Sequence, residues 1–296
     1  MSRSQLPNQW RLQPGRDLAL DRPVLMGILN VTPDSFSDGG LHFTPQDAVR
    51  RAVQMQQEGA TLIDVGGEST RPGSDRVNAA DQIDRVVPVI EAITETLSLP
   101  ISIDTTNAEV ADTALKAGAT IVNDVSAGEE DLEMLSLAAS RQCGLILMHR
   151  LLPPDQDVYS TEYAAEPDYE DVVGVVRSFL LERARAAEAV GVAPETIVLD
   201  PGLGFGKSVA QNWQLINESD RLADMGYPIL GAASRKSFLT AVCGTDVPPA
   251  ERGPASVAAS ILQFQGGCRL FRVHDVALHM AGLARAGEPD HGPAMM

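Results

Sequence analysis

The sequence predicts an α/β protein, and specifically a single-domain (β/α)8 TIM barrel. Eight short β-rich runs alternate along the 296-residue chain with segments of helical periodicity. The runs are almost continuously apolar, which is typical of parallel strands with both faces covered. We place these strands at residues 24–30, 61–67, 101–105, 121–126, 144–149, 196–200, 228–234 and 270–274.

The segments between the strands carry apolar residues at the spacing of one helical face. We expect helices at residues 46–58, 81–97, 107–117, 131–141, 171–190, 211–225, 254–264 and 275–286. Gly59, Gly118 and Gly191 follow three of them, where a glycine commonly ends a helix before the next strand. Eight strand–helix units favour a closed barrel. An open, doubly wound sheet is the alternative, because the number of strands alone does not establish closure.

The two ends of the chain differ from its middle. Residues 1–20 and 287–296 are polar or rich in Pro and Gly. We therefore expect a loosely ordered N-terminal extension and a flexible C-terminal tail. The barrel itself is assigned to residues 21–286, and no low-complexity linker divides that region into further domains.

The charge balance is strongly acidic. Forty acidic and 23 basic side chains give a formal net charge of -17. Such a surface argues against nucleic acid or an anionic membrane as a partner. The sequence has neither a signal-peptide core nor an apolar run of membrane-spanning length, so we expect a soluble, cytoplasmic protein. The three cysteines are far apart and fit no disulfide framework or zinc motif.

Polar side chains stand at the C-terminal ends of the predicted strands. In a closed barrel these ends meet on one rim, which is where active sites lie. Polar groups gathered there are costly to desolvate without partners, so we expect a polar ligand site. The rim positions are Asn30, residues 66–71, Asp104, Asn123, Asp124, His149, Asp200, residues 234–237, Arg272 and His274.

Some of these positions have purely structural alternatives. Asp104 could cap the helix that follows it, and Asp124 could cap a turn. His149 could simply mark the start of a loop. That loop, residues 151–170, is long and contains prolines, and it could be a lid or a surface excursion.

Basic residues are concentrated near the last strands. Of only three lysines, Lys207 and Lys236 follow the sixth and seventh strands, and Arg272 lies in the eighth. Loops in this part of a barrel often bind phosphate, so an anionic substrate is expected. The GLGFGKS run at residues 202–208 is not a P-loop, because Pro201 stands where that motif requires glycine.

Seven motifs resemble, in order, those of the dihydropteroate synthase family, folate-pathway enzymes that sulfonamides inhibit. They are GILNVTPDSFSDGG (27–40), GESTRPG (67–73), ISIDT (101–105), ND (123–124), DPGLGFGK (200–207), SRKS (234–237) and RVHD (272–275). The resemblance implies a homodimeric TIM barrel that condenses 6-hydroxymethyl-7,8-dihydropterin diphosphate with 4-aminobenzoate, using Mg²⁺. The products are 7,8-dihydropteroate and diphosphate.

The resemblance also implies residue roles on the pterin side. Asp200 is expected to accept two parallel N–H groups of the pterin, to which a carboxylate is suited. Asp104 and Asn123 are expected to complete the contacts to the ring. Lys236 is expected to bridge the pterin and the aminobenzoate.

Further roles concern the leaving group and the second substrate. Arg272, His274 and Arg71 are expected to stabilise the departing diphosphate, with Mg²⁺ held in part by Asn30. Asp38 is expected to offset the carbocation that develops at the pterin methylene, so the candidate catalytic residues are Asp38, Lys236, Arg272 and His274. The aminobenzoate pocket is expected to contain Phe36, Thr70, Pro72 and Ser237.

One departure from the family and two alternative functions stand beside this interpretation. The family commonly has Met-His-Met and a glycine after the fifth strand, whereas this chain has Met148, His149 and Arg150 followed by a longer loop. A pterin-dependent methyltransferase would share the pterin contacts but has no reason to keep a diphosphate site. A catalytically silent pterin-binding paralogue would be expected to have lost part of the catalytic set.

Overall fold

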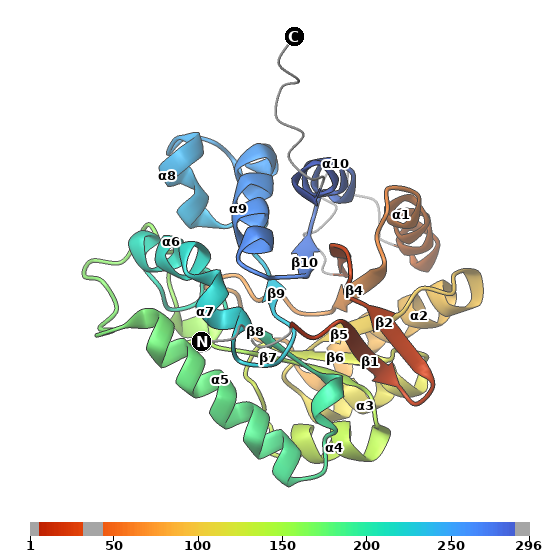
Figure 1. Ribbon diagram of the computed structural model, residues 1–296. Helices are drawn as coiled ribbons and strands as arrows, with labels where there is room; N and C mark the ends of the chain where they lie inside the picture. Colours follow the sequence, from red (N-terminus) through yellow and green to blue (C-terminus); the bar gives the residue numbers. More distant parts are fainter. Residues whose placement is uncertain (1–5, 32–43, 288–296) are drawn as a thin grey trace.

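The computed structural model describes residues 6–31 and 44–287 and contains a closed barrel of parallel strands (Figure 1). The eight strands lie in the order β8-β7-β6-β5-β4-β3-β10-β9. A bridge between Leu199 and Ile229 joins the two ends of that order, so the open-sheet alternative is wrong. The barrel strands are β3 (Val24–Asn30), β4 (Leu62–Gly66), β5 (Ile101–Asp104), β6 (Ile121–Asp124), β7 (Gly144–Met148), β8 (Ile197–Asp200), β9 (Leu230–Gly231) and β10 (Leu270–Val273).

Helices form a ring around the strands (Figure 1). They are α1 (Pro45–Gln57), α2 (Ala79–Thr96), α3 (Ala108–Lys116), α4 (Met134–Arg141), α5 (Val172–Ala189), α6 (Val209–Asn217), α7 (Ser219–Ala223), α8 (Thr240–Cys243), α9 (Gly253–Gln265) and α10 (Val276–Gly287). The predicted helix at 211–225 is divided into α6 and α7. At the division, the Ser219 hydroxyl donates to the carbonyl oxygen of Ile216 at 2.6 Å. This side-chain hydrogen bond competes with the backbone hydrogen bond of a continuous helix.

The first helix illustrates how sequence spacing produces the packing. Thr44 and Asp47 form a capping box at the start of α1, satisfying backbone groups there. Ala48, Ala52 and Met55 recur at helical spacing and form its buried face. A Cβ at Gly27 would lie 2.7 Å from the Met55 sulfur, so glycine in β3 permits the close approach of the helix.

The inside of the barrel changes character along each strand. Its lower part is an apolar cluster that includes Leu62, Ile121, Val198 and Leu270. Side chains two residues apart in a strand point to the same side. The next inward positions after these four residues are therefore Asp64, Asn123, Asp200 and Arg272, and the polar layer follows from the two-residue period.

An antiparallel hairpin, β1 (Gln9–Gln13) and β2 (Arg16–Ala19), crosses the opposite end of the barrel (Figure 1). Trp10, Leu12 and Leu20 are buried against the apolar interior cluster. The Trp10 indole N–H donates to the carbonyl oxygen of Thr196 at 2.8 Å. The expectation of a loosely ordered N-terminal extension is therefore wrong for residues 9–19, because these apolar side chains close the barrel.

One predicted strand is shorter in the structure, and the predicted tail falls outside the described residues. Strand β9 is shorter than the predicted 228–234, and Ile229 contributes only the closing bridge. Residues 288–296 of the expected C-terminal tail lie outside the described part of the chain. Within that part, no helix has both the length and the apolar character needed to cross a membrane.

Because Trp10 of the hairpin is fully buried, we expect it to contribute to the stability of the fold. Trp10→Ala should lower the free energy of unfolding by about 3–5 kcal/mol, because it empties a packed position and leaves the Thr196 carbonyl without its donor. Trp10→Phe, which keeps most of the volume, should cost less than half as much. Urea unfolding followed by circular dichroism measures both. Equal stability of Trp10→Ala and the wild type would contradict the sealing role.

Candidate active site

Strand register brings four of the predicted residues or their neighbours onto one edge of the barrel. Asn30 pairs with Gly66, Gly66 with Asp104, and Asp104 with Asn123, across β3, β4, β5 and β6. Asp200 ends β8 beside Met148 of β7. The predicted rim is thus a contiguous surface at the C-terminal ends of the strands.

Arg272 is the centre of this surface. Its Nε lies 2.6 Å from Asp64 Oδ2, and one of its terminal nitrogens lies 2.7 Å from Asp104 Oδ2. The Asn123 amide donates to the Asp64 carboxylate at 3.3 Å. The side chain of Arg272 is 16% exposed, while those of Asp64 and Asp104 are 0% and 4% exposed. The ion pairs therefore lie inside the barrel, where charges need close partners.

Asp64 was not predicted from the sequence. It lies in the middle of an apolar strand rather than at its end, and it is fully buried. A signal was present, because Asp64 stands two residues after Leu62 and must share its inward direction. A buried carboxylate at such a position requires a cation, and Arg272 supplies it.

Asp104 has one oxygen bound and one unsatisfied. Oδ2 accepts from Arg272, whereas the buried Oδ1 has no hydrogen-bond partner among the described residues. Burial raises the pKa of the Asp104 carboxyl, and Arg272 opposes this effect. An N–H donor on a bound ligand would satisfy Oδ1. Asn107, rather than Asp104, caps α3, so the capping alternative for Asp104 is wrong.

Asp200 and Lys236 form a second part of the site. The Gly202 N–H donates to Asp200 Oδ1 at 2.7 Å. Burial raises the pKa of Asp200 to about 6 and lowers the pKa of Lys236 to about 8. The Lys236 ammonium lies 4.0 Å from the centre of the Phe205 ring, a cation–π contact that orients it.

A small apolar cluster adjoins these polar groups. Val125, Met148 and Phe205 are buried together, apart from the main core. Met148 is the strand neighbour of Asp200, and Phe205 carries the Lys236 contact. Carboxylates and an amide beside a flat apolar surface suit a planar heterocycle with N–H groups along one edge. The sequence did not identify these three residues, because apolar side chains at strand ends do not stand out from the core.

Lys207 lies in a different place from the one expected. It is fully buried, and its ammonium contacts the carbonyl oxygens of Gly202 at 2.9 Å and Phe205 at 2.8 Å, together with His149 Nδ1 at 3.0 Å. Burial, with Lys207 adding to the effect, lowers the pKa of His149 to about 2, so its neutral ring accepts from the ammonium. Lys207 therefore fastens the loop after β8 and is not part of an exposed cationic rim. Asp124 accepts from the N–H groups of Ser126 and Gly128, which confirms the turn alternative.

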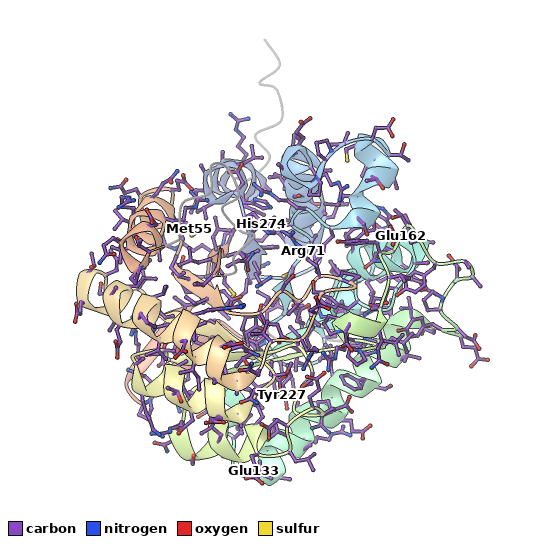
Figure 2. The ribbon with its side chains drawn as sticks, turned by 180° about the vertical axis from the view of Figure 1, so that it is seen from behind. Met55, Arg71, Glu133, Glu162, Tyr227 and His274 are labelled. Atoms are coloured by element: carbon purple, nitrogen blue, oxygen red, sulfur yellow. The ribbon has the colours of Figure 1, made fainter. Side chains whose placement is uncertain are left out.

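The positive charge instead gathers around His274. Burial and the nearby Arg235, Arg272, Lys236 and Arg71 lower the pKa of His274. Arg71 and His274 are drawn next to each other in Figure 2, at the end of the barrel remote from the hairpin. Ser234 Oγ accepts the His274 backbone N–H at 3.1 Å and lies 3.0 Å from its Nδ1. With the Ser234 hydroxyl donating to Nδ1, Nε2 carries the ring hydrogen and can donate to an anion.

The loop that carries Ser234 and Lys236 has a strained residue between them. Arg235 has a φ of 62°, in the left-handed region that favours glycine. The conformation is held because Ser256 Oγ accepts its N–H at 3.0 Å and Arg252 donates to its carbonyl at 3.2 Å. Such fixed strain commonly accompanies functional sites.

Asn30 is the residue that the sequence analysis expects to hold Mg²⁺. Among residues 6–31 and 44–287, no group of three His, Cys, Asp or Glu side chains could hold a metal ion. Gly66 separates Asn30 Oδ1 from Asp104 Oδ2, since a Cβ there would lie 3.8 Å from each oxygen. One amide oxygen suits a Mg²⁺ ion that keeps its waters and arrives on a phosphate substrate, not an ion held by the protein alone.

Two predicted residues of the first loop, Phe36 of the aminobenzoate pocket and the candidate catalytic Asp38, lie outside the described residues. Thr70 and Pro72 lie in the loop after β4, and Ser237 follows Lys236 in the loop after β9. The Ser237 hydroxyl oxygen accepts the backbone N–H of Ser160 at 3.2 Å.

Comparisons with known proteins identify the family. The family described as "Pterin binding enzyme" matches residues 26–274. The chain is 47% identical over 262 residues to the dihydropteroate synthase of Streptococcus pyogenes serotype M18, covering 88% of this chain and 94% of the relative. It is 41% identical to that of Bacillus subtilis, covering 92% of each.

Solved structures give the same result. Dihydropteroate synthase of Xanthomonas albilineans with 4-aminobenzoic acid has a TM-score of 0.85 and 42% identity, covering 95% of this chain and 99% of that one. The same enzyme in complex with 7,8-dihydropteroate has a TM-score of 0.82 and 39% identity, covering 95% and 100%. The chain belongs to the dihydropteroate synthase family of pterin binding enzymes.

Proposed function

We propose that this transferase forms 7,8-dihydropteroate from 6-hydroxymethyl-7,8-dihydropterin diphosphate and 4-aminobenzoate in an Mg²⁺-dependent reaction. The observation that carries the proposal is the arrangement of Asp104 Oδ1, Asn123 and Asp200 beside the Val125–Met148–Phe205 cluster. The comparisons name synthases, and they do not support the methyltransferase or silent-paralogue alternatives.

The pterin binds with its N–H edge toward the buried carboxylates. Asp200 accepts two of these N–H groups, since its pKa of about 6 leaves it ionised at neutral pH. Asp104 Oδ1 accepts another, which removes its lack of a partner. Phe205 and Met148 cover a face of the ring, and Lys236 lies between this pocket and Ser237.

Cleavage of the carbon–oxygen bond separates a cation at the pterin methylene from the diphosphate. Arg71, Arg272 and the Nε2–H of His274 stabilise the negative charge of the leaving oxygens. Mg²⁺ supplies further positive charge to the diphosphate, and Asn30 Oδ1 is the described residue that would hold it. Asp38 offsets the developing carbocation. The arylamine, held between Phe36, Thr70, Pro72 and Ser237, attacks as the neutral amine.

Two broader features of the proposal concern the state of the protein. We expect a cytoplasmic homodimer, as the family resemblance implies.

The reaction is tested directly with purified protein, pterin diphosphate, 4-aminobenzoate and Mg²⁺, by measuring released diphosphate and dihydropteroate together. We expect equal amounts of the two products, loss of turnover with EDTA, and recovery when Mg²⁺ is restored. Turnover that persists after complete chelation would refute the metal requirement. Folded protein without any turnover would refute the synthase activity.

Asp200→Asn should weaken pterin binding by about 2 kcal/mol, roughly 30-fold, because an amide cannot accept two parallel donors. In the wild type, affinity should also fall as the pH drops through about 6, where Asp200 gains a proton. The variant should lose the part of this response that comes from Asp200 and keep the part that comes from Asp104, whose pKa burial raises to about 7. Isothermal titration calorimetry between pH 5 and pH 8 measures both effects, and an unchanged affinity would contradict the assigned contact.

Arg272→Ala should reduce kcat by about 100-fold, because it removes charge from the leaving group. It also leaves Asp64 and Asp104 without their cation, so Arg272→Lys serves as the matched variant that keeps a charge. Steady-state kinetics with diphosphate as product inhibitor separates the effects. A change confined to the KM for 4-aminobenzoate would contradict the assigned role.

A further inference from the structure

The long segment between β7 and α5 makes contacts that the family motifs do not account for. We call residues 151–170 the strap. In Figure 1 it is the green loop that extends past α6 before α5 begins. The strap was expected to be a lid or a surface excursion. Its buried residues, Pro154, Asp157 and Ser160, indicate that it is instead fastened to the protein.

The strap is attached to the loop after β8 at Gly206, and the Ser208 hydroxyl also donates to Glu166 of the strap at 2.8 Å. Asp157 Oδ2 accepts the Gly206 N–H at 2.9 Å, and the Tyr169 hydroxyl donates to the Gly206 carbonyl at 2.9 Å. A Cβ at Gly206 would lie 2.2 Å from Leu151 Cβ, so this approach requires glycine. Asp157 also accepts from the Tyr163 hydroxyl and the Val158 N–H, which fixes the strap's own turn.

From this anchor the strap reaches both sides of the proposed arylamine pocket. The Pro154 carbonyl accepts the N–H of Gly73, the residue after Pro72, at 2.8 Å. The Ser160 N–H donates to Ser237 Oγ at 3.2 Å. Thr70 and Pro72 on one side, and Ser237 on the other, are thus joined through the same strap.

Ser160 is held by a residue of α6. The fully buried Asn212 donates through Nδ2 to Ser160 Oγ at 3.1 Å and accepts the Gly204 N–H at 2.7 Å. The same amide donates to the carbonyl oxygens of Lys207 and Ser208 at the start of α6. Because Asn212 is held by these partners, its contact with Ser160 Oγ keeps this part of the strap close to the loop that carries Ser237.

The contact determines what the Ser237 hydroxyl can do. Its oxygen accepts from Ser160, so its own hydrogen is left to donate. Within the described part of the chain, that hydrogen has no acceptor. The carboxylate of 4-aminobenzoate is the strong acceptor that this substrate offers, and a hydroxyl-to-carboxylate hydrogen bond is charge-assisted.

We propose that the strap, anchored by Asp157, is a positioning element for the arylamine half of the site, and that Ser160, held by Asn212, directs the Ser237 hydroxyl toward the substrate carboxylate. The proposal rests on the synthase function argued above. It adds a role for a segment in which this chain departs from its family. The pterin half is expected to depend on it less, because Lys207 also fastens the loop after β8 through the carbonyl oxygens of Gly202 and Phe205.

The test is a double-mutant cycle between Asp157→Ala and Ser237→Ala, read as KM for each substrate. Ser237→Ala should raise the KM for 4-aminobenzoate about tenfold, as expected for one lost hydrogen bond to a charged group. Asp157→Ala should raise it by a similar factor, and the double variant no further. The KM for pterin diphosphate should stay within about twofold, which also verifies folding.

Two further variants keep the test decisive. Glu162→Ala, which removes an exposed strap carboxylate labelled in Figure 2, is the matched control and should behave as the wild type. If Asp157→Ala does not fold, Ser160→Ala decides, because it removes only the Asn212 contact and should raise the same KM about threefold.

The outcomes separate the strap's role from the function itself. A wild-type protein without turnover would remove the synthase function, and this inference with it. If the wild type turns over normally, three results would overturn the positioning role alone. They are additive effects of Asp157→Ala and Ser237→Ala, equal rises in the KM values of both substrates, and an effect of Asp157→Ala no larger than that of Glu162→Ala.

Discussion

A guanidinium group inside a protein is stable only where anions are brought to it, and here they come from two other strands of the same barrel. Arg272 of β10 contacts Asp64 of β4 and Asp104 of β5. Removal of one partner from such a buried set costs several kcal/mol. The pairs therefore tie three strands together across the interior. They also leave Asp104 Oδ1 without a partner at the proposed site, so closure of the barrel and the proposed binding depend on the same charges.

The two-residue period of a strand explains why this polar layer lies directly above an apolar one. Leu62, Ile121, Val198 and Leu270 fill the lower interior, and the residues two positions later form the site. A shift of one residue in any of these strands would turn its polar side chain toward the helices. The packing of the lower layer thus determines the direction of the functional side chains.

The sequence was sufficient to predict the eight strands and most of the polar residues at their C-terminal ends. Both features follow from the local pattern of apolar and polar residues. It was insufficient where a residue's role depends on distant partners. Asp64 was missed since its cation is 208 positions away, and Trp10 was missed since its partner lies at Thr196. Lys207 was assigned to the rim because it follows the sixth strand in the sequence. In the structure it is buried, and its ammonium donates to backbone carbonyl oxygens of its own loop. Contacts between residues so far apart cannot be read from short stretches of sequence.

The hairpin at the other end of the barrel has a consequence for how ligands enter and leave the interior. Among the described residues, Trp10, Leu12 and Leu20 close the end of the barrel opposite the candidate site. If both substrates enter from the other end, the one that lies deeper has to bind first and leave last. An order of binding is then expected from the position of the hairpin, although the hairpin itself lies at the far end from the site.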